Sequence, residues 1–192
     1  MGGAHGVNAA SSALSGLRGA LLLARGRPEG LGELPTDMAG AARSFRAAAV
    51  GLPLFLILLV AGTRLGAPPL TAPGLVLQLL GYAIAWAGYA VLSHRLVTAL
   101  GKEARWPRFI AVWNWVNVVQ YLLLLAATLP ALAGAPDWLA QTAALLGQGW
   151  ALWLEWYAIR LALDATGLVA AAVMAPDVLL GVALALALAA PG

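Results

Sequence analysis

Six polar side chains interrupt long apolar stretches of this sequence, and their chemistry needs an explanation: Tyr89, Asn114, Asn117, Gln120, Glu155 and Asp177. Three of them form a ladder, because Asn114, Asn117 and Gln120 follow one another at three-residue spacing. In a helix, Asn114, Asn117 and Tyr121 lie on one stripe, with Gln120 at its edge. Amide and carboxyl groups are costly in an apolar environment, so we expect this stripe to face other helices.

The depth of each group along its segment predicts which groups meet. With a helical rise of about 1.5 Å per residue, Asn114 lies about 9 Å and Gln120 about 18 Å from the end of their segment. The same rise puts Glu155 about 7 Å and Asp177 about 18 Å from the same side of the bundle. We therefore predict two polar layers, a shallow one of Asn114, Glu155 and Tyr89 and a deep one of Gln120 and Asp177.

Each polar group has a structural and a functional interpretation. Amides in membrane helices commonly hold helices together, and we predict that Asn114 or Asn117 hydrogen-bonds Glu155. Glu155 also lies five residues before Arg160, which favours an ion pair near the surface over a proton carrier. Asp177 has no cation at its depth, so a structural role and a functional role are both open.

The motifs of known enzyme classes are missing from the sequence. It contains no GxSxG, no HExxH and no glycine-rich phosphate loop. It has no cysteine and only two histidines, His5 and His94, which are too far apart for a haem with two imidazole ligands. We therefore predict no catalytic residue, no metal site and no cofactor.

The composition indicates a membrane protein. The chain is 62% hydrophobic and 10% charged, whereas soluble domains are usually about 25% charged. Five blocks are apolar over about the 20 residues that a transmembrane helix needs. These blocks are Phe45–Thr63, Leu70–Ser93, Phe109–Ala133, Trp138–Ile159 and Ala165–Ala190. The predicted fold is an all-α integral membrane protein, with a cytoplasmic segment over residues 1–44 and a five-span bundle over residues 45–192.

Basic residues predict the orientation of this bundle. Ten of the eleven Lys and Arg residues precede the first block or lie in connections on the same side, and only Arg64 lies on the other side. Such a bias marks the cytoplasmic side, so the N-terminus is expected inside the cell and the C-terminus outside. Seven of these residues are predicted to face anionic lipid headgroups: Arg18, Arg25, Arg43, Arg46, Lys102, Arg105 and Arg108. No nucleic-acid surface is predicted.

The N-terminal segment contains a short amphipathic pattern. Between residues 11 and 25, Ala13, Leu14, Leu17, Ala20, Leu21 and Ala24 share one helical face, and Arg18 and Arg25 lie opposite. This pattern predicts a helix in the cytoplasmic membrane interface. Thr36 or Asp37 is expected to cap a second helix that leads into the first span. Trp106, Trp113 and Trp115 are interpreted as an aromatic belt at the same interface.

Three stretches carry a resemblance to a known family: MAGAARSFRAAAVGLPLFL, LVTALGKEARWPRFIAVWNWVNVVQ and WLEWYAIRLALDATGLVAAAV. Together with the amphipathic segment, their order resembles a group of small uncharacterised bacterial inner-membrane proteins. Their layout is similar to that of the five-span Yip family of Rab-interacting membrane proteins. The Asp-Leu-Tyr-Gly-Pro signature of that family is replaced here by LPTDMAGAA. The resemblance implies a bacterial inner-membrane location and supplies no catalytic residue.

We expect a non-enzymatic membrane scaffold or interaction protein. The alternative is a small transporter or channel-like protein with its polar site around Glu155 and Asp177. Small residues recur at four-residue spacing, at Gly147 and Ala151 and again at Gly181, Ala185 and Ala189. They allow close helix contacts within the bundle, with a second copy or with another membrane protein.

Overall fold

The all-helical architecture is confirmed by a computed structural model, which describes residues 3–189 and the side chains of residues 13–188. The predicted end of the last span, Ala190, lies outside this range. The elements are α1 (Gly3–Ala24), η1 (Pro28–Glu33), α2 (Met38–Ser44), α3 (Arg46–Arg64), α4 (Ala72–Ala99), η2 (Glu103–Arg105), α5 (Trp106–Leu132), α6 (Asp137–Leu163) and α7 (Gly167–Ala189).

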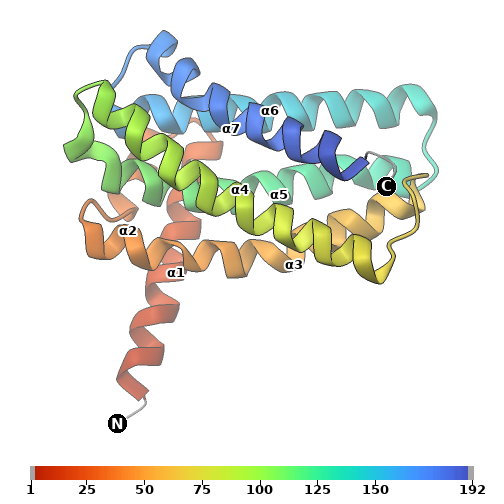
Figure 1. Ribbon diagram of the computed structural model, residues 1–192, viewed down its shortest axis with the longest axis horizontal. Helices are drawn as coiled ribbons and strands as arrows, with labels where there is room; N and C mark the ends of the chain where they lie inside the picture. The colour runs from red at the N-terminus through yellow and green to blue at the C-terminus, as the bar shows by residue number, and fades with distance from the viewer. Residues whose placement is uncertain (1–2, 190–192) are drawn as a thin grey trace.

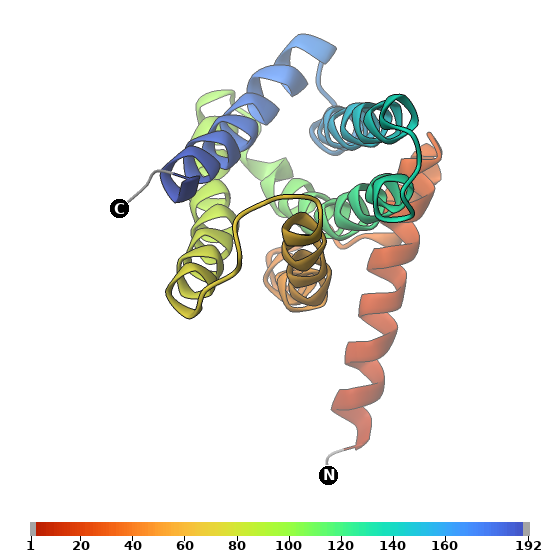
Figure 2. The same ribbon diagram turned by 90° about the vertical axis from the view of Figure 1, so that its right-hand side faces the viewer.

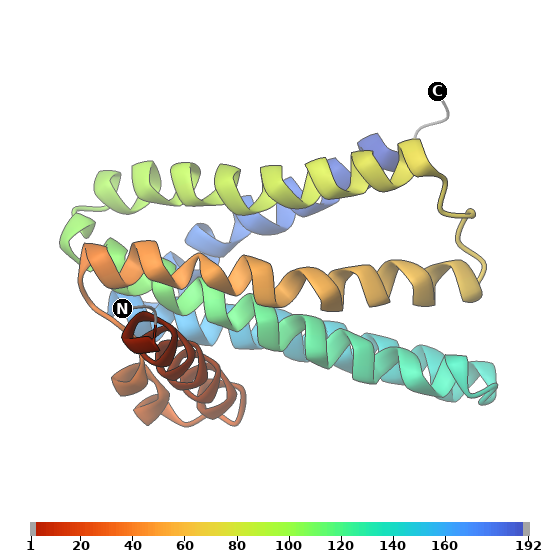
Figure 3. The same ribbon diagram turned by 90° about the horizontal axis from the view of Figure 1, so that it is seen from below.

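Five long helices, α3 to α7, run up and down along the length of the molecule (Figures 1 and 3). Each occupies one of the five apolar blocks, and α4 and α6 extend several residues beyond the predicted ends. The start of α3, the end of α4, the start of α5, the end of α6 and the start of α7 therefore lie at one end of the bundle. The ten basic residues on one side of the chain all belong to this end, which we call the basic end.

Local signals set the helix boundaries. The Asp37 carboxylate accepts a hydrogen bond of 2.7 Å from the Gly40 backbone N–H and caps α2, so Asp37 and not Thr36 is the cap. The Thr71 hydroxyl caps α4 in the same way, with a 3.2 Å bond from the Gly74 N–H. Phe45 interrupts the helix between α2 and α3, whereas Pro53 lies inside α3 without ending it.

Four stretches of the described chain are long and apolar enough to cross a membrane: Met38–Arg64, Ala72–Ala99, Glu103–Leu132 and Gly167–Leu188. The remaining long helix, α6, has 27 residues but is not among them. Its glutamines, its Glu155 and its four tryptophans lower its hydropathy. The length of α6 thus suits a span, while its composition requires that part of its surface be covered.

The outside of the long helices is apolar. Large exposed side chains include Val76, Leu80 and Val91 on α4 and Leu179 and Leu186 on α7. A soluble protein rarely leaves such continuous apolar surface in water. The exterior therefore suits lipid, as the sequence predicted.

The N-terminal helix α1 lies across the long helices near the basic end (Figures 1 and 2). The face that contains Gly16, Ala20 and Leu23 is buried against the protein, and a side chain at Gly16 would collide with the Trp115 indole. Two bonds of 3.0 Å from α6 hold the end of the helix, one from the Trp150 indole to the Ala24 carbonyl and one from the Tyr157 hydroxyl to the Gly26 carbonyl.

This docking corrects the predicted role of the apolar face of α1. Ala20 and Ala24, which the sequence assigned to the lipid-facing side, are buried in protein contacts. Leu14 remains exposed, so only part of the predicted face is free to meet lipid. Arg18 pairs with Glu33 at 3.5 Å, because η1 folds back beside α1.

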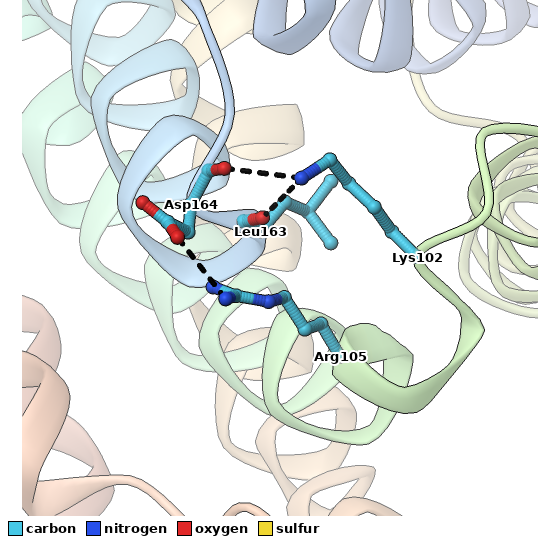
Figure 4. Close-up of polar contacts among 4 residues, drawn as sticks. All are labelled: Lys102, Arg105, Leu163 and Asp164. Carbon is cyan, nitrogen blue, oxygen red and sulfur yellow. Dashed lines mark hydrogen bonds and ion pairs between the residues drawn. The ribbon is translucent and has the colours of Figure 1, made fainter.

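Residues of the α4–α5 connection bind the C-terminal end of α6 through hydrogen bonds and an ion pair (Figure 4). The Lys102 ammonium donates to the carbonyls of Leu163 at 3.2 Å and Asp164 at 3.1 Å, and Arg105 pairs with the Asp164 carboxylate at 3.0 Å. A cation is favourable at a helix C-terminus, where the last carbonyls lack backbone partners. Lys102 and Arg105, predicted to face headgroups, therefore hold the α6–α7 turn, in which Asp164 adopts a left-handed conformation with φ of 46°.

We predict that Gly147→Leu destabilises the protein by about 1–3 kcal/mol, the usual range for overpacking. A side chain at Gly147 would meet the Cβ atom of Ala127, where α6 crosses α5. Gly181→Leu is the matched control, because no described residue of another helix lies within 4 Å of a Cβ atom at that position. Reversible unfolding in mixed detergent micelles measures both changes, and equal stability of the two variants would contradict close α5–α6 packing at Gly147.

Candidate functional site

Glu155 is the most deeply enclosed acid of the described chain. Glu155 lies on α6 and is only 3% exposed. One of its carboxyl oxygens, Oε2, accepts a 3.3 Å hydrogen bond from the Gln120 amide on α5. The same Gln120 nitrogen donates to the Ala151 carbonyl at 2.9 Å, one turn earlier on α6. The other oxygen, Oε1, is buried and has no hydrogen-bond partner among the described residues. Gln120 therefore fixes the rotation of α6 against α5 and leaves half of the carboxyl group unsatisfied.

Asp177 on α7 completes the site from a third helix. Its Oδ2 atom accepts a 3.1 Å hydrogen bond from the Trp113 indole N–H on α5. Trp113 also lines the small gap beside Glu155, so Asp177 and Glu155 approach the same indole from α7 and α6, and their carboxyl groups lie close to each other. We call Glu155 and Asp177 the acid pair. It is held by Gln120 and Trp113, which both belong to α5.

The packing beside Glu155 excludes water. The gap among Glu155, Phe109, Val112 and Val116 is too small for a water molecule. Two carboxylates in contact repel each other strongly where water is absent. One proton shared by the pair removes this repulsion, because a protonated carboxyl group donates to its neighbour. Holding a proton is thus the simplest chemistry that this arrangement supports.

Tyr89 approaches the same region from α4 and binds backbone. Its buried hydroxyl donates to the Val173 carbonyl on α7 at 3.0 Å. Pro176, three residues further along α7, has no N–H and weakens the helical hydrogen bonding in this turn. The centres of the Tyr89 and Trp113 rings lie 4.7 Å apart, so Tyr89 also packs against the indole that hydrogen-bonds Asp177.

The predicted bond from Asn114 or Asn117 to Glu155 is wrong. Asn114 donates to the Ser44 hydroxyl of α2 at 2.7 Å, and Ser44 donates in turn to the Ala41 carbonyl. The Asn117 amide donates to the Trp113 carbonyl of its own helix at 3.0 Å. Depth fixes the height of a residue but not the direction in which it points. Asn114 and Gln120 are six residues apart, about 120° around a helix, so they face different neighbours.

The two predicted layers are therefore rearranged. Glu155 belongs with Gln120 and Asp177, the two residues assigned to the deep layer. Tyr89 hydrogen-bonds the backbone of α7 and Asn114 hydrogen-bonds Ser44 of α2, so neither forms a hydrogen bond with Glu155. The polar interior consists of the acid pair and a separate Asn114–Ser44 contact nearer the N-terminal elements.

The predicted ion pair between Glu155 and Arg160 is also absent. Arg160 is exposed, and its guanidinium lies 5.7 Å from the centre of the Trp156 ring. The described ion pairs are Arg18–Glu33 and Arg105–Asp164. Five residues rotate a helix by about 140°, so an inward-facing Glu155 directs Arg160 toward the outside.

Two residues of the site were not predicted. Ser44, at the end of α2, was missed because no spacing rule connects it to Asn114. Trp113 was interpreted as part of an aromatic belt, yet it is 3% exposed and binds Asp177. Its seven-residue distance from Gln120 puts both side chains on the same helical stripe, and this signal would have found it.

The site offers no cluster of metal ligands, since the described residues contain no group of three His, Cys, Asp or Glu side chains suited to a metal ion. Comparison of the chain with known protein families, with curated proteins and with solved structures gives no match.

We predict that Gln120→Leu destabilises the bundle by about 1–3 kcal/mol, because it leaves a second buried oxygen of Glu155 without a donor. Adding Glu155→Gln should recover part of this loss. Asn114→Leu combined with Glu155→Gln is the matched control and should be additive, since Asn114 bonds Ser44 instead. Unfolding free energies of the two double-mutant cycles test the site, and coupling in the Asn114 cycle alone would contradict it.

Proposed function

We propose that this chain is a five-span integral membrane protein of the bacterial inner membrane, with its N-terminus in the cytoplasm. The apolar exterior of α3, α4, α5 and α7 and the ten basic residues at one end support this assignment. Arg64, at the other end of α3, is the single basic residue outside that group. The resemblance of the sequence to small bacterial inner-membrane proteins with a Yip-like layout points in the same direction.

In this proposal α6 crosses the membrane as well, which brings the number of spans to five. It runs antiparallel to both neighbours, and its buried face lies against α5 and α7 (Figure 1). Its polar residue Glu155 faces protein, so lipid need not accommodate the carboxyl group. An odd number of spans places the two termini on opposite sides of the membrane.

The proposed function is a non-enzymatic scaffold or interaction protein at the membrane surface. The observation that carries it is the docking of the C-terminal half of α1 across the basic end. Leu14 is exposed and lies beside Leu17 and Leu21, with Arg18 and Arg25 along the same shallow surface. A fixed apolar strip with cations beside it suits an anionic membrane surface or a membrane-bound partner. The protein therefore presents a surface, and the bundle anchors it.

A small transporter or channel-like protein is the second candidate, and the acid pair favours it. Buried acids within membrane spans commonly mark proton or ion pathways. Here the Glu155 carboxyl group has one oxygen without a hydrogen-bond partner and lies close to a second acid, an arrangement that can hold a proton. The gap beside it has no room for water, which favours a structural role over a conducting one.

The topology proposal predicts the activity of reporter fusions. A reporter that works only in the cytoplasm should be active when fused after Gly101, in the α4–α5 connection, and silent when fused after Gly192. The reason is that five spans put these positions on opposite sides. The same reporter inserted after Gly134, between α5 and α6, should be silent. An active C-terminal fusion would rule out five spans with a cytoplasmic N-terminus.

Asp177→Asn separates the two candidate functions. A scaffold should tolerate this change, because the asparagine oxygen still accepts the Trp113 indole bond and the amide donates to Glu155. We expect unchanged expression, unchanged stability within about 1 kcal/mol and no change in proton flux across proteoliposomes, where a pH-sensitive dye reports the flux. Asp137→Asn, at the other end of the bundle, is the control. Proton flux in the wild type that Asp177→Asn abolishes would favour transport.

A further inference from the structure

A polar stripe runs along α6 beyond the acid pair. Gln141, Gln148 and Glu155 follow each other at seven-residue spacing, so they lie on one side of the helix. Glu155 is enclosed, whereas Gln141 and Gln148 are exposed. No described residue hydrogen-bonds either glutamine side chain. The protein thus encloses Glu155 but leaves the amides of Gln141 and Gln148 exposed.

The path of α7 explains where the cover ends. Asp177 meets Glu155, and from there α7 runs away from α6 toward α4 (Figure 2). Leu180 and Leu188 of α7 pack at Gly88 and Gly81 of α4. Among the described helices, none covers Gln141 and Gln148, which stay exposed.

An uncovered amide at this depth is unfavourable in lipid. Gln148 lies eleven residues from the start of α6, about 16 Å at a rise of 1.5 Å per residue, which is close to the middle of a bilayer. Hydrocarbon chains offer the amide no hydrogen-bond partner. The same helix is the one long helix that is not apolar enough to count among the candidate spans. Both observations show that this side of α6 needs a polar partner.

We propose that this partner is the same stripe of α6 in a second copy of the chain, related by a twofold axis along the membrane normal. Such an axis places each Gln148 at the same depth as its counterpart. A carboxamide is self-complementary, because it carries both donors and an acceptor. Ala144 lies one turn before Gln148 on the same side of α6, and its small side chain lets two helices approach closely. The seven-residue repeat matches the seam of a left-handed helix pair.

This inference rests on the proposed membrane span of α6, and cysteine cross-linking tests it in membranes. The chain has no cysteine, so a single Gln148→Cys substitution introduces one thiol per copy. The variant should form a disulfide-linked dimer on mild oxidation, since paired Cα atoms in such an interface come within disulfide distance. Leu146→Cys is the matched control at almost the same depth. It is 68% exposed but lies about 160° away around the helix, so it should stay monomeric.

Two further readouts separate the outcomes. Gln148→Leu should weaken dimerisation about three- to tenfold, as measured by energy transfer between labelled copies in diluted bilayers, because an interhelical amide bond is lost. Equal cross-linking at positions 146 and 148, or none at 148, would overturn the dimer. A cross-link from position 148 to a different protein would overturn it as well. Rapid labelling of Gln148→Cys by a water-soluble maleimide would show that the stripe faces water, and reporter fusions then tell whether α6 spans at all.

Discussion

The requirement that a buried carboxyl group find hydrogen-bond donors governs the arrangement of this protein. Glu155 is enclosed on α6, and its hydrogen-bond donor among the described residues, Gln120, comes from α5. Gln120 bridges Glu155 and the Ala151 carbonyl, which fixes how α6 is rotated against α5. Trp113, seven residues before Gln120 on the same stripe, donates its indole N–H to Asp177 and so joins α7 to α5. Because the gap beside Glu155 is too small for water, these protein groups must provide the polar contacts themselves.

Polar side chains lie inside the bundle or at its ends, and apolar side chains cover its outer surface. The long helices expose leucine and valine along their length, and the charges gather at the ends. At the basic end, Lys102 and Arg105 bind the last turn of α6, and the C-terminal half of α1 lies across the long helices. Such a body suits anchoring and presentation of a surface better than conduction. The uncovered half of the α6 stripe is the place where this separation of polar and apolar surface is incomplete within one chain.

Apolar length and turn signals in the sequence were sufficient to predict the five long helices, whereas α1 begins at Gly3, earlier than the predicted residue 11. Apolar length identified five blocks, and Asp37 was one of two predicted caps for α2. The contacts between helices were harder to predict, because a single sequence specifies depth but not rotation. Asn114 and Glu155 seemed matched in height, yet Asn114 turns toward Ser44 and Gln120 takes its place. Trp113 was interpreted as an interface anchor. The sequence did not show its hydrogen bond to Asp177, because Asp177 lies 64 residues away along the chain. Seven-residue spacing was the one rotational signal that would have linked Trp113 to Gln120.

The central claim is that α6 crosses the membrane although its composition is less apolar than that of its neighbours. Single cysteines at Asp137 and Arg160, the two exposed ends of α6, test this directly in intact cells. A membrane-impermeant maleimide added outside should label Asp137→Cys, while Arg160→Cys should react only after the membrane is opened. Labelling of both positions from outside, or of neither, would contradict the account.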